Sequence, residues 1–79
     1  MATIDLKTLL GMAIKTRRAS LGISQEELAY RAGLHRTYIS DLERGARNPS
    51  IESIEKLASA LQVSVAKLFE AADDGQRST

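Results

Sequence analysis

The sequence predicts an all-α protein with five helices. Apolar residues recur every three to four positions, as on one face of a helix, and no window alternates apolar with polar residues as a strand does. Helix-forming residues dominate, whereas the chain holds 5 glycines and 1 proline. Its 79 residues suffice for one domain and not for two.

The first helix is expected over residues 5–20. Asp5 can accept a backbone hydrogen bond at its start, and Gly22 can adopt the left-handed conformation that ends many helices. The residues of its apolar face are Leu6, Leu9, Leu10, Ala13 and Ile14.

The second helix is expected to begin at Ser24 and to end at Gly33. Ser24 and Glu27 have the spacing of a capping box, in which the hydroxyl accepts a backbone N–H bond and the carboxylate reaches back. The third helix is expected over residues 36–43, with His35 near its cap position.

The fourth and fifth helices are expected to start after the capping residues Ser50 and Ser64. The apolar residues of the fourth helix are Ile51, Ile54, Leu57, Ala58 and Leu61, and those of the short fifth helix are Val65, Leu68 and Phe69. The domain is expected to span residues 1–72, and residues 73–79 to form a flexible tail because they offer no apolar side chain to bury.

Residues 25–44 have the pattern of two short helices joined by a tight turn. Ala29 is small where the helices would cross, and Gly33 lies in the turn, where a positive φ favours glycine. The apolar contacts between the helices come from Leu34, Ile39 and Leu42. The polar side chains left to face outward are His35, Arg36, Thr37, Ser40, Asp41 and Arg44. This layout is typical of a helix-turn-helix that places its second helix in the DNA major groove, and a plain helical hairpin is the alternative.

Charge is unevenly distributed along the chain, although the net charge is +1. Residues 15–50 carry seven Lys/Arg and four acids, whereas residues 51–79 carry three and five. A polyanion would be attracted to the middle of the chain, and ordinary solvated charge is the alternative.

Several classes of function are not expected. The chain has no cysteine and one histidine, so it lacks a disulfide framework and a zinc ligand set. It has neither a G-x-x-x-x-G-K loop nor an H-E-x-x-H motif, and we expect no enzyme activity, cofactor or metal. No apolar run approaches the ~18 residues of a membrane span, and the N-terminus lacks a signal-peptide pattern, so a cytoplasmic protein is expected.

The resemblance to a known family rests on residues 24–50, which read S-Q-E-E-L-A-Y-R-A-G-L-H-R-T-Y-I-S-D-L-E-R-G-A-R-N-P-S. This segment resembles the Cro/lambda-repressor (XRE) family of bacterial and phage regulators, and with its flanking helices the match covers residues 6–69. The run R-T-Y-I-S-x-L-E-R-G-x-R-N-P-S resembles the controller proteins of restriction–modification systems. The resemblance implies a compact five-helix bundle (a lambda-repressor-like DNA-binding domain), a two-fold homodimer and a near-palindromic operator.

Three residues of the third helix are expected to read bases. Arg36 can donate two hydrogen bonds to guanine O6 and N7, although the same side chain can instead contact a phosphate. Thr37 can contact a base edge or a thymine methyl group, or else a phosphate. Ser40 lies one turn further on and faces the groove.

A second set of residues is expected to contact the DNA backbone: Gln25, His35, Tyr38, Arg47, Asn48 and Ser50. The resemblance implies that Gln25 contacts phosphate and braces the recognition helix, and an ordinary exposed glutamine is the alternative. Tyr38 offers either its hydroxyl to a phosphate or its ring to the fourth helix. His35 is expected as a cap or a peripheral DNA contact, because no second metal-ligating residue accompanies it.

Two further groups are expected to act through protein contacts. The spacing of Arg18 and Glu43 to the glycines that follow them resembles the family's arginine–glutamate pair, which implies a structural ion pair near the DNA boundary. The dimer interface is expected at Ile51, Leu61, Val63, Val65 and Phe69, the alternative being that all of them serve the core of one subunit.

The sequence therefore predicts a sequence-specific transcriptional regulator. We expect it to bind a near-palindromic double-stranded operator as a dimer, with the helix over 36–43 in the major groove. With no sensing domain, its signal is expected to be its own concentration rather than a small-molecule ligand, and the controller resemblance points to a restriction–modification operon. The alternative is an antitoxin or adaptor that uses the same fold to bind a protein.

Overall fold

The computed structural model describes residues 4–77. Its helices are α1 (Leu6–Ser20), α2 (Gln25–Ala32), α3 (Arg36–Glu43), α4 (Ile51–Ala60) and α5 (Val65–Arg77). No strand occurs within this part of the chain. The predicted all-α fold with five helices is confirmed.

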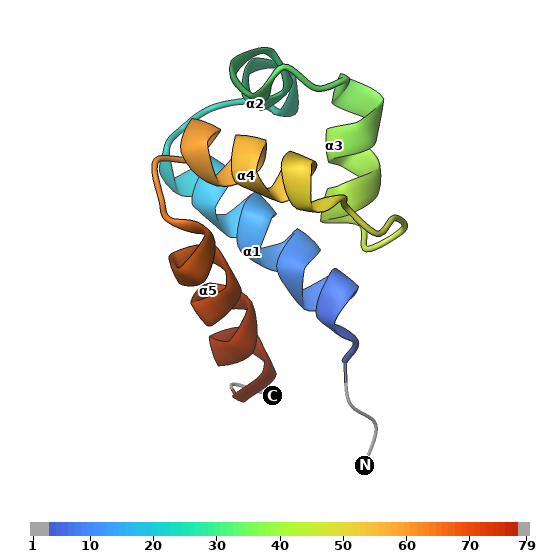
Figure 1. The fold of residues 1–79 in the computed structure, drawn as a ribbon, viewed down its shortest axis with the longest axis vertical. Helices are drawn as coiled ribbons and strands as arrows, with labels where there is room; N and C mark the ends of the chain where they lie inside the picture. Colours follow the sequence, from blue (N-terminus) through green and yellow to red (C-terminus); the bar gives the residue numbers. More distant parts are fainter. Residues whose placement is uncertain (1–3, 78–79) are drawn as a thin grey trace.

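The central element is α1. Both α3 and α5 pack along it, whereas α4 contacts α2 and α5. Figure 1 shows α2 and α3 together at the upper end of the molecule, away from the first turn of α1 and the last turns of α5 at the lower end. The two helices of the predicted motif therefore form one end of the bundle.

The core is formed by apolar side chains from every helix. The largest of the fully buried side chains, each at most 2% exposed, are Ile14, Leu28, Ile39, Leu42, Leu57, Leu61 and Leu68. Burying one such side chain contributes roughly 1.5–3 kcal/mol. No helix in residues 4–77 has the length and apolar character needed to cross a membrane.

Helix starts follow the predicted capping residues. The side chains of Asp5, Ser24 and Ser50 accept backbone N–H bonds of 3.0, 3.0 and 3.1 Å. The capping box of α2 forms only in one direction, because the Glu27 carboxylate accepts a 2.8 Å bond from Arg31 instead of reaching back.

A close approach between α1 and α3 depends on Gly11. A Cβ atom added to Gly11 would lie 2.1 Å from the carbonyl oxygen of Leu42, well inside van der Waals contact. The absence of a side chain lets the last turn of α3 rest directly on α1. The position of α3 is thus set partly by backbone contact.

The C-terminal helix is longer than the sequence predicts. Residues 73–77 were expected in a flexible tail, yet they continue α5. Ala72 is 1% exposed, and a Cβ added to Gly75 would lie 3.5 Å from Leu9 Cδ2, so this part of α5 packs on α1. The helix is sustained by this packing, and the expected tail residues 78–79 lie outside the described part of the chain.

Candidate nucleic-acid interface

The turn between α2 and α3 is fixed by Gly33. This residue caps α2 with φ 68° and ψ 35°, a left-handed conformation that favours glycine. Leu34 N then donates a 2.9 Å hydrogen bond to Ala29 O. Ala29 is 4% exposed and Ile39 is fully buried, so the small residue and the apolar residue lie where the motif requires them.

The outward side of α3 carries the residues expected to read bases. Ile39, Leu42 and Glu43 form its buried side. Arg36 and Thr37 are exposed in the first turn, and Ser40 is half-buried one turn later. The structure thus places the three predicted base-reading residues on the accessible part of one short helix.

His35 lies at the N-terminal edge of this surface. It is exposed and occupies the N-cap position of α3, but its side chain makes no capping hydrogen bond. Among the described residues, no group of three His, Cys, Asp or Glu side chains is placed to hold a metal ion. The imidazole is therefore open to solvent beside the base-reading residues.

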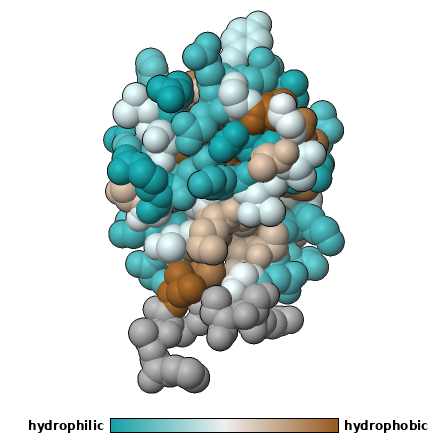
Figure 2. All heavy atoms as spheres, turned by 180° about the vertical axis from the view of Figure 1, so that it is seen from behind, coloured by the Kyte–Doolittle hydropathy of each residue, from teal (hydrophilic) through white to brown (hydrophobic). Residues whose placement is uncertain are grey.

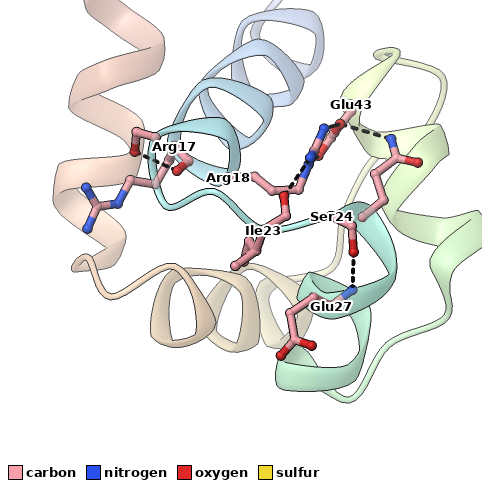
Figure 3. A network of polar contacts seen from close by, with 8 residues as sticks. Arg17, Arg18, Ile23, Ser24, Glu27 and Glu43 are labelled. Carbon is pink, nitrogen blue, oxygen red and sulfur yellow. Dashed lines mark hydrogen bonds and ion pairs between the residues drawn. The ribbon is translucent and has the colours of Figure 1, made fainter.

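Behind α3, one buried carboxylate joins three elements. Glu43 Oε2 lies 2.6 Å from Arg18 Nε, and Glu43 Oε1 accepts a 3.0 Å bond from Arg18 Nη2. Gln25 Nε2 donates a further 3.0 Å bond to Oε1, and Arg18 Nη1 donates to Ile23 O at 2.9 Å. Figure 3 shows Arg18 reaching from α1 toward both Glu43 and Ile23. The ion pair expected from the sequence is present, and Gln25 braces α3 through Glu43.

Burial strengthens this junction. The side chain of Glu43 is 3% exposed and that of Arg18 is 16% exposed, so water screens the pair weakly. Hydrogen bonding to Glu43 raises the pKa of the Arg18 guanidinium above its ordinary value. The result is a fixed connection from α1 and α2 to the end of α3.

The segment after α3 brings the expected backbone-contacting residues to the same end of the molecule. The Arg47 guanidinium carbon lies 4.9 Å from the centre of the Tyr38 ring, a cation–π distance. Tyr38 is half-buried and packs against the core, whereas Arg47 and Asn48 are exposed. Ser50 caps α4, where backbone N–H groups and the positive end of the helix favour an anion.

Asp41 is a member of this surface whose role the sequence did not predict. Its Oδ1 lies 2.5 Å from Arg44 Nη2, and its Oδ2 lies 3.7 Å from Arg47 Nη1. The i, i+3 spacing of Asp41 and Arg44 on a predicted helix is the signal that could have indicated the first contact.

The structure separates the residues expected at a dimer interface. Leu61 is fully buried in the core of the subunit, and its carbonyl oxygen accepts a 2.9 Å bond from Arg17 Nε, so its expected place at an interface is wrong. Ile51 is 78% exposed and Val65 is 38% exposed. Phe69 is half-buried in a groove, here called the Phe69 groove, whose lining residues are Leu6, Lys7, Leu10, Asn48, Pro49, Ile54 and Phe69.

Val63 belongs to a different surface. It lines a hollow between α1 and α5 together with Ala13, Leu68 and Ala71. Figure 2, the view from behind, shows weakly apolar surface in the lower half of the molecule beneath a mostly hydrophilic upper half. The five expected residues therefore do not form one continuous patch on a single subunit.

Comparison with known proteins agrees with this geometry. The model of the helix-turn-helix family matches residues 14–68. The chain is 48% identical over 62 residues to the control protein C.BamHI of Bacillus amyloliquefaciens, covering 77% of this chain and 76% of that protein.

Two solved structures share the fold. The clp gene regulator ClgR from Corynebacterium glutamicum superposes with a TM-score of 0.90 at 32% identity, covering 95% of this chain and 96% of that chain. The restriction–modification controller protein C.Esp1396I, solved as a tetramer with its 35 base-pair operator, gives a TM-score of 0.83 at 39% identity, covering 90% and 93%. The chain belongs to the Cro/lambda-repressor (XRE) helix-turn-helix family of DNA-binding transcriptional regulators.

Proposed function

We propose that this protein controls transcription by binding a near-palindromic operator as a homodimer, with α3 in the major groove. The observation that carries the proposal is the outward side of α3, where Arg36, Thr37 and Ser40 lie on a helix held rigidly from behind by Glu43. A recognition helix needs such support, because base contacts depend on a fixed helix position.

The contacts with DNA divide into two kinds. Arg36 is assigned to guanine, with Thr37 and Ser40 contacting neighbouring base edges. The backbone contacts are assigned to residues at the start of α2, at and within α3, and between α3 and α4: Gln25, His35, Tyr38, Arg47, Asn48 and Ser50. They position the protein on the duplex and supply the salt-dependent part of the affinity.

Dimerisation is assigned to the Phe69 groove and the exposed Ile51. The groove is lined mainly by apolar residues, most of them on α1, α4 and α5, and Ile51 lies two residues after Pro49 and three before Ile54, both of which line it. An exposed isoleucine beside an apolar groove is typical of a surface that a second protein copy covers. A two-fold dimer would place two recognition helices about 34 Å apart, one turn of DNA.

The regulatory input is assigned to the concentration of the protein itself. A dimer that forms in the working concentration range makes operator occupancy rise steeply as the protein accumulates. The similarity to C.BamHI and C.Esp1396I supports an operator in a restriction–modification operon that includes the gene of this protein. Because the ligand is DNA, we place its action in the bacterial cytoplasm.

Selection from random duplex DNA near physiological salt tests the proposal. We expect enrichment of an inverted repeat with half-sites about one helical turn apart. A transcription assay with the selected site upstream of the gene then tests autoregulation. Weak, salt-sensitive binding without enrichment of any sequence would reject a sequence-specific regulator in favour of a protein-binding module.

A further inference from the structure

Asp41 places a negative charge among the side chains proposed to face DNA. Spacings of four and three residues place Thr37, Asp41 and Arg44 on the same side of α3, with Arg44 just after its last residue. A carboxylate at this position opposes binding to a phosphate backbone, because like charges repel. Both of its oxygens face arginines.

The contacts form a cluster of Tyr38, Asp41, Arg44 and Arg47, here called the Asp41 cluster. Arg44 Nη2 lies 2.5 Å from Oδ1, a charge-assisted hydrogen bond, and Arg47 Nη1 lies 3.7 Å from Oδ2. The Arg47 guanidinium also stacks 4.9 Å from the Tyr38 ring centre. Asp41 is 26% exposed, whereas Arg44 and Arg47 are 65% and 53% exposed, so the anion lies beneath two accessible cations.

We propose that Asp41 is an internal competitor of DNA phosphate for Arg44 and Arg47, and that it thereby limits the affinity of the protein for the DNA backbone. This inference rests on the proposed function. Carboxylate and phosphate oxygens bind guanidinium groups through the same charge-assisted hydrogen bonds. In the free protein the arginines are held by Asp41, and on DNA they exchange this partner for phosphate.

Breaking the ion pairs of Asp41 costs little free energy, so binding of the arginines to DNA phosphate can offset it. An exposed ion pair shifts an equilibrium by only a few fold, so both arginines remain available to DNA. Nonspecific binding depends almost entirely on phosphate contacts, whereas operator binding also has base contacts. Asp41 therefore reduces the time that the protein spends on nonoperator DNA while the base contacts sustain operator binding.

The substitution Asp41→Asn tests the inference, since it removes the charge and nearly preserves the size of the side chain. We expect the affinity for the selected operator and for a nonoperator duplex of equal length to rise by about two- to fivefold at low salt. The gain should shrink as salt increases, because exposed charges are then screened.

A matched control is Glu70→Gln. Glu70 Oε1 lies 3.8 Å from Lys67 Nζ in another exposed i, i+3 pair, so this variant also loses one negative charge. Glu70 lies on α5, which packs on α1 and α4. We expect its affinity for both duplexes to stay close to that of the wild type, which separates the local effect of Asp41 from the effect of net charge.

A double-mutant cycle provides a readout that a structural role would not change. Arg44→Gln removes a side chain that binds DNA phosphate but is already engaged by Asp41 in the free protein. In the otherwise unchanged protein, this substitution should therefore lower the affinity for DNA only slightly. In the Asp41→Asn background, Arg44 is free, and the same substitution should weaken binding by about two- to fivefold more.

Three outcomes would overturn the inference. The first is unchanged affinity of Asp41→Asn, or a gain no larger than that of Glu70→Gln. The second is a loss on the operator alone, which would assign Asp41 to base reading. The third is failure of the unchanged protein to bind either duplex, which would reject the proposed function as well, whereas the first two leave it standing.

Discussion

Arg18 Nε lies 2.6 Å from Glu43 Oε2, and this contact joins α1 to the last residue of the helix proposed to read DNA. A second bond of 3.0 Å from Arg18 Nη2 to Oε1 makes the pair bidentate. With Glu43 3% exposed, its charge depends on protein partners rather than on water. Removing either partner leaves the other side chain poorly solvated.

Replacing Glu43 with glutamine should therefore destabilise the fold. We expect Glu43→Gln to lower the free energy of unfolding by about 3 kcal/mol, because the Arg18 guanidinium loses its counter-charge in a place that water reaches poorly. Urea denaturation measures the change. The matched control is Glu27→Gln, whose pair with Arg31 has side chains 43% and 40% exposed and should contribute about 0.5 kcal/mol or less. Equal losses in the two variants would contradict a structural role for the buried pair.

The close contact between α1 and α3 predicts that an alanine at position 11 strongly destabilises the fold. In Gly11→Ala the new Cβ would lie 2.1 Å from Leu42 O, and neither backbone segment can move without displacing α3. We expect a loss of about 3 kcal/mol in the free energy of unfolding, at the upper end of typical overpacking. Chemical denaturation of Gly11→Ala and Gly22→Ala tests this.

Gly22→Ala is a useful control because it introduces backbone strain without a steric clash. Gly22 has φ +69°, and nothing lies within 4 Å of an added Cβ. Backbone strain alone should therefore lower the free energy of unfolding of Gly22→Ala by about 1–2 kcal/mol. If Gly11→Ala proves less destabilising than Gly22→Ala, the direct contact of α1 with α3 is not as close as described.

Helix starts and the motif could be predicted from the sequence because local rules determine them. Asp5, Ser24 and Ser50 are capping residues followed by apolar residues at helical spacing, and each one caps a helix in the structure. Gly33 ends α2 for a reason that is also local, the positive φ of the turn.

What the sequence mispredicted depends on tertiary contacts. Periodicity identifies Leu61 as apolar but does not say whether a neighbouring helix or a second subunit covers it, and the structure buries it within one subunit. Likewise, the local sequence of residues 73–77 disfavours a helix, yet α5 continues because Ala72 and Gly75 pack close to α1. The Arg47–Tyr38 contact joins residues in different elements, where helical spacing gives no guidance.

Two arginines should affect DNA binding in different ways. Arg36→Ala should weaken the binding free energy by about 1–3 kcal/mol for the selected operator and by much less for a nonoperator duplex, because a bidentate contact with guanine is specific. Arg47→Ala should weaken binding to both duplexes similarly and lower the salt slope, because it removes a phosphate contact. Titrations of both duplexes at several salt concentrations separate these effects. Equal losses for Arg36→Ala on the two duplexes would reassign Arg36 to phosphate.

Acid should weaken the start of α1. Hydrogen bonds from Thr8, through its side chain first and then its backbone, lower the pKa of Asp5 below 3.8. A lowered folded-state pKa means that the cap stabilises the helix above the unfolded pKa and loses this effect as pH falls through the folded value. We expect the stability difference between the wild type and Asp5→Asn to be constant at neutral pH and to shrink below about pH 4. Urea midpoints measured from pH 7 to pH 2 test this, and a constant difference throughout would rule out the carboxylate as the source.

The final prediction separates the surface of the dimer from the core of the subunit. Ile51→Ser should raise the dimer dissociation constant at least about tenfold, because an exposed side chain that a partner buries is a typical interface anchor. The subunit should stay folded, since Ile51 is 78% exposed. Sedimentation over a concentration series measures the equilibrium, and operator binding should weaken in parallel because both half-sites require a subunit.

Two comparisons make this result interpretable. Tyr30 is 83% exposed on α2, so Tyr30→Ser removes a similar exposed side chain from another element and should leave the monomer–dimer equilibrium unchanged. Leu61→Ala should instead lower the free energy of unfolding by about 2–5 kcal/mol, because it opens a cavity in the core. An Ile51→Ser protein that dimerises as tightly as the wild type would move the interface away from the start of α4. The hollow between α1 and α5 lined by Val63 would then be the next surface to substitute, because it is the other apolar depression to which an expected interface residue contributes.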